Sequence, residues 1–235
     1  METNYIFNIN EVKVMSTQQL SNAYVSDAQR FALQHKVLRN TYALLSMTVL
    51  FSGAMAAVSI ASNAPHPGII LTLVGYFGLL FLTHKTRNSS LGLLSVFALT
   101  GFMGWTLGPL VGAYWSTAPT VVVQALVGTG TIFAGLSIYA LTTKKDFSAM
   151  GSALFIGIIV AFLAGLGAIF FEIPALSLAV SAMFVLLMSG LILFETSNIL
   201  RGGETNYIMA TVSLYVALFN LFTSLLHLLG FNQSE

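Results

Sequence analysis

Very few ionisable side chains lie inside the long apolar stretches of this sequence, and Glu195 is the outstanding one. It lies in Leu-Phe-Glu-Thr-Ser-Asn at 193–198, about one helical turn before its stretch ends. A carboxylate shielded from water is costly unless it is paired or protonated, so this acid is a candidate proton- or ion-sensing group. The alternative is a shallow carboxylate near the lipid headgroups, satisfied by Arg, Ser or Asn side chains. Its candidate cationic partners lie at the same end of the apolar stretches: Lys85, Arg87 and Arg201.

A second polar pattern runs along the last apolar stretch, at 207–230. Its members follow one another at intervals of four, three, four and three residues: Ser213, Ala217, Asn220, Ser224 and His227. This spacing places them on one face of a helix. A polar face within hydrocarbon is expected to turn towards the bundle interior, which predicts that the last helix is central and surrounded by the others. Simple hydrogen bonding to neighbouring helices is an alternative role for these side chains.

Motifs of several membrane-embedded enzyme classes are absent from the sequence. It has no His-Glu-x-x-His helix, no second acid inside an apolar stretch for an aspartyl pair, and no P-loop. It has no cysteine, and therefore no thiol nucleophile or thiolate metal site. All of its lysines lie outside the apolar stretches, where none can form a retinal Schiff base, and His66 and His84 are isolated in loops. The sequence therefore predicts no catalytic residue, no cofactor and no metal site.

The composition is that of a chain embedded in a lipid bilayer. Hydrophobic residues make up 56% and charged residues only 7%, and the mean hydropathy is +0.85. Soluble domains carry about 25% charged residues. The net charge of +1 gives no indication of a nucleic-acid partner. Seven apolar stretches are long enough for membrane spans, and we place them at 40–62, 68–83, 91–114, 120–142, 149–171, 175–199 and 207–230.

The positive charges predict how these seven helices are oriented. All nine Lys and Arg residues lie before the first span or in the second, fourth and sixth loops. Cytoplasmic loops are enriched in Lys and Arg, so the N-terminus is predicted to be cytoplasmic and the C-terminus periplasmic. We expect a flexible cytoplasmic tail at 1–39 with a short helix at 26–38, a bundle at 40–230 and a short tail at 231–235. Met15 is a second plausible translation start.

Glycine and alanine recur at helical spacing in two spans. The small residues in question are Gly101, Gly104, Gly108 and Gly112 in the third span, and Gly157, Ala161 and Gly165 in the fifth. Membrane helices approach closely where small residues face each other. Both patterns predict tight helix packing, with a pore lining as the alternative.

The C-terminal third resembles a known family. The stretch at 194–230, FETSNILRGGETNYIMATVSLYVALFNLFTSLLHLLG, is similar to the C-terminal signature of the Bax inhibitor-1 (TMBIM) family. The resemblance extends to HKVLRNTYALLS at 35–46, PGIILTLVGYFGLLFLTHKT at 67–86 and LTTKKD at 141–146. It implies a seven-helix fold with a central last helix. Resemblance to the proteobacterial branch implies an inner-membrane regulator that binds the AAA+ protease FtsH and inhibits degradation of its membrane substrates.

The chain departs from the ion-leak members of that family at one position. The resemblance implies that those members carry two buried acids on the last two helices, which form a pH-sensitive gate. The first acid matches Glu195, but the second falls on Ala217. A calcium ion prefers several oxygen ligands, so the loss of one carboxylate favours the regulator over a pH-sensitive calcium or cation leak that uses Glu195.

Overall fold

All regular secondary structure is helical over the residues that the computed structural model describes, 4–143 and 145–231, with side chains described from residue 32 onward. The helices are α1 (Asn4–Ala61), α2 (Ile69–Thr86), α3 (Ser90–Thr117), α4 (Pro119–Thr142), a short 3-10 turn η1 (Ser148–Met150), α5 (Gly151–Phe170), α6 (Pro174–Leu200) and α7 (Tyr207–Phe231). Seven of them are long and apolar enough to cross a membrane. The prediction of seven spans is confirmed.

The helices end where the sequence supplies turn-forming residues. Pro119 and Pro174 occupy the first positions of α4 and α6, where a missing N–H costs nothing. After α6, Gly202 takes a φ of +76°, and its N–H donates to the carbonyl of Ile199 at 3.1 Å. The N–H of Gly203 donates to the carbonyl of Asn198 at 2.9 Å. Glycine is favoured at this left-handed position, and the two bonds satisfy carbonyls that the helix end leaves open.

Helix α1 begins much earlier than the first predicted span. The sequence predicts a tail at 1–39 with a short helix at 26–38, whereas the helix is continuous from Asn4 to Ala61. Among the residues with described side chains, the part of α1 that is long and apolar enough to cross a membrane lies within Ala32–Ala61. The physical reason lies in the sequence, since no glycine or proline occurs before Gly53 to interrupt the helix. The flexibility of this segment and its boundary with the bundle stay predictions.

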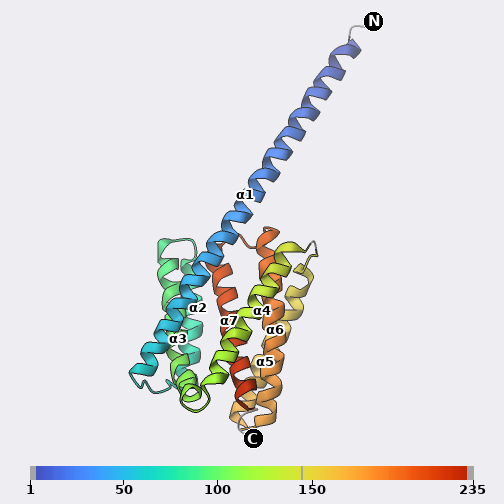
Figure 1. The fold of residues 1–235 in the computed structure, drawn as a ribbon. Coiled ribbons are helices and arrows are strands. Elements are labelled where there is room, and N and C mark those ends of the chain that lie inside the picture. The colour runs from blue at the N-terminus through green and yellow to red at the C-terminus, as the bar shows by residue number, and fades with distance from the viewer. Residues whose placement is uncertain (1–3, 144, 232–235) are drawn as a thin grey trace.

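Helix α7 is the central element of the bundle (Figure 1). It packs against α1, α3, α4 and α6, while α2 packs mainly on α3 and α5 mainly on α6. The predicted central position is therefore confirmed, with the correction that α7 is surrounded by four helices rather than six. The remaining two lie at the periphery because α3 and α6 stand between them and most of α7. Helix α2 buries only one side chain, that of Thr83.

Small residues bring α3 and α1 into close contact, as their spacing predicts. A Cβ atom at Gly104 would collide with the carbonyl of Ser52, and one at Gly108 would collide with the side chain of Ser59. On α5, Gly157 lies against Leu187 of α6. These glycines are needed because a neighbouring helix occupies the space of a side chain.

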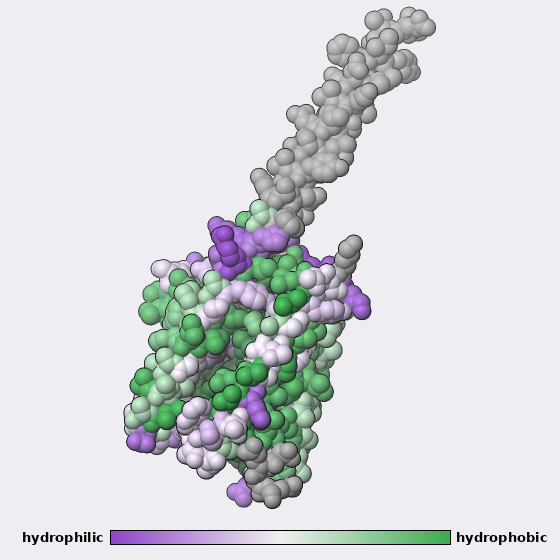
Figure 2. Space-filling view, viewed as in Figure 1, coloured by the Kyte–Doolittle hydropathy of each residue, from purple (hydrophilic) through white to green (hydrophobic). Residues whose placement is uncertain are grey.

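Polar and apolar surfaces are segregated along the bundle. Apolar side chains cover the sides, and hydrophilic residues gather near the ends (Figure 2). The described Lys and Arg side chains stand at the end that holds the α2–α3, α4–α5 and α6–α7 loops. This one-sided distribution agrees with the charge pattern of the sequence. Which end faces the cytoplasm stays a prediction.

Candidate functional site

Glu195 lies on the side of α6 that faces α7. It is half-buried, and its hydrogen-bonding partner is the hydroxyl of Ser213 on α7. Met188 and Ile192 precede it on the same face of α6 at intervals that keep all three towards α7. Another carboxylate, that of Glu204, acts on it electrostatically. Glu195 is thus a polar group within a helix–helix contact.

The predicted cationic partners do not reach Glu195. Within the described part of the chain, neither Lys85, Arg87 nor Arg201 forms an ion pair with it. This corrects the prediction for all three. Arg201 follows the last turn of α6, and its side chain turns towards the α4–α5 loop instead, where Nε lies 3.3 Å from a carboxylate oxygen of Asp146. Lys85 is exposed at the end of α2.

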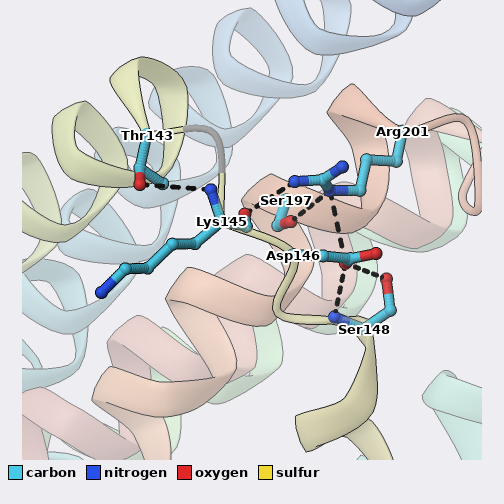
Figure 3. A network of polar contacts seen from close by, with 6 residues as sticks. All are labelled: Thr143, Lys145, Asp146, Ser148, Ser197 and Arg201. Atoms are coloured by element: carbon cyan, nitrogen blue, oxygen red, sulfur yellow. Dashed lines mark hydrogen bonds and ion pairs between the residues drawn. The ribbon is translucent and has the colours of Figure 1, made fainter.

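Arg201 is the centre of a polar network that joins two loops (Figure 3). Besides the ion pair, its Nε donates to Ser197 Oγ at 3.3 Å and a terminal nitrogen donates to the carbonyl of Lys145 at 2.7 Å. Asp146 also accepts hydrogen bonds from the Ser148 hydroxyl at 2.6 Å and the Ser148 N–H at 2.9 Å. These two bonds, and after them the Arg201 guanidinium, lower the pKa of Asp146 from its ordinary value. The network fixes the loop before α5 onto the end of α6.

The predicted polar stripe of α7 divides into two polar contacts separated by an apolar layer. Ser213 meets Glu195 near one end, and His227 Nδ1 lies 2.9 Å from Ser181 Oγ near the other. Between them Ala217 is fully buried. It belongs to one cluster with Met188, Ile192 and Leu221.

The other stripe members are satisfied locally or buried. The side-chain amide of Asn220 donates to the carbonyl of Val216 on its own helix at 2.8 Å, and Ser224 is buried. This geometry favours hydrogen bonding within and between helices over a continuous polar path along α7. The role of Glu195 as a sensing group stays a hypothesis.

Two tyrosine hydroxyls form contacts that the sequence reasoning missed. The hydroxyl of Tyr215 on α7 lies 2.6 Å from Ser52 Oγ on α1 and donates to the carbonyl of Thr100 on α3 at 3.2 Å. The hydroxyl of Tyr42 on α1 lies 3.2 Å from Thr196 Oγ1 on α6. Tyr215 is part of the Ser-Leu-Tyr signature, so the motif pointed to the residue but gave it no role.

Asn206 is a second residue that sequence reasoning missed. Its side-chain oxygen accepts from the N–H groups of Ile208 and Met209, at 3.0 and 3.1 Å, and so caps α7. Its amide nitrogen donates to the carbonyl of Arg87 at 3.1 Å and to Asn88 Oδ1 at 2.8 Å. An Asn immediately before an apolar stretch was a recognisable cap signal. No sequence pattern indicated the hydrogen bonds from Asn206 to the α2–α3 loop.

The arrangement provides packing and polar contacts between helices rather than assembled reactive groups. In the region with described side chains, no three His, Asp or Glu residues gather closely enough to hold a metal ion. The comparisons with known proteins indicate no catalytic family. Fold and site together define a multi-pass, all-helical membrane protein whose central helix is fixed by hydrogen bonds to its neighbours.

The chain belongs to the Bax inhibitor-1 family. Residues 34–234 match the family model described as "Inhibitor of apoptosis-promoting Bax1". The "Modulator of FtsH protease YccA" of Escherichia coli K12 is 55% identical over 202 residues, which cover 86% of this chain and 92% of the relative. "Inner membrane protein YccA" of E. coli O6:H1 has the same identity and coverage. A membrane protein of Vibrio cholerae is 45% identical over 208 residues, covering 87% and 93% of the two chains. The chain is accordingly a multi-pass protein of the inner membrane.

Proposed function

We propose that this protein is an inner-membrane regulator that binds the membrane-anchored protease FtsH and slows the degradation of its membrane substrates. The observation that carries the proposal is the 55% identity to a protein named as a modulator of FtsH, across 92% of that relative's length. The similarity covers 86% of this chain, so it extends well beyond a single motif.

The packing of the bundle supports a regulator that the protease engages without readily extracting. An AAA+ protease pulls on one segment and unfolds the helices attached to it, so resistance depends on the packing of the first helices that are pulled. Here α1 fits closely against α3 at Gly104 and Gly108. The Tyr215 hydroxyl adds a buried hydrogen-bonded contact that links α1, α3 and α7. Residues 1–31, at the N-terminal end of the chain, would supply the segment that is engaged.

The second candidate is a pH-sensitive cation leak, and its supporting observation is Glu195 within the α6–α7 contact. Two features weigh against it. The second acid of leak-type members is replaced by Ala217, and Ala217 lies in an apolar layer with Met188, Ile192 and Leu221. An ion crossing that layer would lose hydration without gaining protein ligands.

Co-purification tests the regulator directly. Tagged full-length chain and a form lacking residues 1–31 are isolated from solubilised membranes and examined for FtsH, and the half-life of an FtsH membrane substrate is measured when each is overproduced. We expect FtsH with both forms, a longer substrate half-life, and slower turnover of the truncated form. Absence of FtsH from both, with an unchanged half-life, would refute the proposal.

Flux measurements test the leak separately. Proteoliposomes that contain the wild type or Glu195→Gln are compared with empty vesicles for calcium and proton entry. We expect all three to be equal. Entry above empty vesicles that Glu195→Gln abolishes would establish the leak instead.

A further inference from the structure

A groove opens to the membrane between α1 and α4. Both helices pack on α3, α6 and α7, and the space between them is a hollow of about 510 Å³. Its walls include Val49 and Gly53 on α1 and Leu126 and Gly130 on α4, and Phe219 of α7 lies at its base. The space-filling view shows this face hollowed in the same region (Figure 2). The volume lies within the range of about 300–1,000 Å³ found for small-molecule sites.

The few polar groups in the groove are already hydrogen-bonded within the protein. The Tyr215 hydroxyl and Ser52 Oγ bond to each other, and Thr129 donates to the carbonyl of Ala125 at 2.7 Å. The remaining lining is almost wholly apolar. An occupant of this part of the groove is therefore expected to be hydrocarbon, since a polar one would lose hydration without compensation.

A second hollow, of about 540 Å³, lies where the groove reaches the end of the bundle. Tyr42 lines both hollows, so they adjoin. The second is lined by His35, Lys36 and Arg39 of α1 and by Leu141 of α4, and among the residues from 32 onward no acidic side chain lines either hollow. Lys36 and Arg39 are exposed and make no ion pair or hydrogen bond to the described residues. A cationic end adjoining an apolar length matches a molecule with an anionic head and a hydrocarbon tail.

We propose that the α1–α4 groove binds one anionic phospholipid, with its phosphate at Lys36 and Arg39 and one acyl chain along Val49, Leu126 and Phe219. A partner's transmembrane helix fits less well, because the positive charge is confined to one end of the groove. The site does not depend on association with FtsH.

The first test measures the headgroup contact by native mass spectrometry of the full chain. Phosphatidylglycerol and phosphatidylcholine with identical acyl chains are titrated into the detergent-solubilised protein. We expect one phosphatidylglycerol to bind in preference. Lys36→Gln with Arg39→Gln should weaken it by about thirtyfold, at roughly 1 kcal/mol for each charge near an anionic lipid, while leaving phosphatidylcholine unchanged.

The matched control removes one Lys and one Arg from the same end of the bundle but from the other side, as Lys85→Gln with Arg87→Gln. We expect its lipid preference to equal that of the wild type. An equal loss in both double variants would mean a general attraction to the charged end and would overturn the proposal.

The second test fills the groove. Gly130→Phe places a ring in the hollow, whereas Gly135→Phe changes the same helix outside it, and a Cβ atom at either glycine meets nothing within 4 Å. We expect Gly130→Phe to lower binding of both lipids at the site several-fold and Gly135→Phe to have no effect. Unchanged phosphatidylglycerol binding by Gly130→Phe would overturn the proposal.

The third test identifies the occupant in cells. A photoreactive amino acid replaces Leu126, which is 56% exposed, and the cross-linked product is weighed. An adduct of phospholipid mass is expected. A polypeptide adduct would show that a partner helix occupies the groove and would refute the lipid site.

Discussion

At the scale of single residues, Ala217 differs most clearly from what the family resemblance implies. The resemblance implies an acid at this position in leak-type members, whereas Ala217 is fully buried among apolar side chains of α6 and α7. The layer needs a small apolar group there. Glu195, one turn or more away along the same contact, has a serine rather than a second acid as its partner.

Ala217→Asp should therefore destabilise the protein strongly. A carboxylate added between Met188, Ile192 and Leu221 would be buried without a cation, at a cost of about 2–5 kcal/mol. Thermal unfolding in detergent measures the effect, with Ala217→Leu as the control for added volume alone, which costs about 1–3 kcal/mol. An Asp variant that unfolds at or above the temperature of the Leu variant would contradict the apolar layer.

Asp146 gives a pH dependence outside the membrane-spanning segments. Its pKa is lowered in the folded protein by the two bonds from Ser148 and then by Arg201. A lowered folded-state pKa contributes stability above the unfolded value, and this contribution is lost as the pH falls through the folded value. We expect the α4–α5 loop to open below about pH 4, the ordinary range of Asp.

Hydrogen exchange of the amides at 145–148 measures this opening. In Asp146→Asn the α4–α5 loop should already be open at neutral pH. Lowering the pH should then cause no further loss of amide protection in this loop. Equal protection in wild type and variant at neutral pH would exclude a role for the ion pair.

At the scale of helices, the α1–α3 contact depends on which glycines face a neighbour. Gly104 lies against the carbonyl of Ser52, whereas Gly53 has open space around its Cβ position. Two glycines that look alike in the sequence therefore have different roles.

Gly104→Ala should lower the unfolding temperature, because the methyl group forces the helix backbones apart, at a cost of about 1–3 kcal/mol. Gly53→Ala should leave it unchanged or raise it, since alanine favours a helix over glycine by up to about 1 kcal/mol. Thermal unfolding of the two variants side by side checks this. Equal changes in unfolding temperature would show that α1 and α3 do not pack closely at Gly104.

The helices themselves were largely predictable, because apolar length and turn residues are local properties of the sequence. The central place of α7 also followed from its polar spacing. The pairing of Arg201 with Asp146 was not predictable, because it joins residues far apart in sequence and depends on how two loops meet. The early start of α1 differs from the prediction because a polar composition is also typical of a tail, whereas no glycine or proline interrupts the helix before Gly53.

At the scale of the whole molecule, the one-sided positive charge predicts the orientation in the membrane. The chain has no cysteine, so single cysteines report their exposure without background. Two positions are suitable for Ser→Cys substitutions. Ser62 follows α1, and Ser89 lies between α2 and α3, at the end of the bundle where the described Lys and Arg side chains gather.

We expect an impermeant thiol reagent to label Ser62→Cys from the periplasmic side and Ser89→Cys only after the inner membrane is opened. Labelling of both by a permeant reagent is the control. The reverse pattern would place the N-terminus outside and overturn the orientation.

The shortness of α2 has a consequence for the surrounding bilayer. Its 18 residues rise about 1.5 Å each, which gives about 27 Å, whereas a typical hydrocarbon core is about 30 Å thick. Because α2 lies at the periphery and buries only Thr83, lipids meet it directly. A span shorter than the hydrocarbon thickness draws the two leaflets together beside it. We therefore expect the bilayer to be thinner beside α2 than around the rest of the protein.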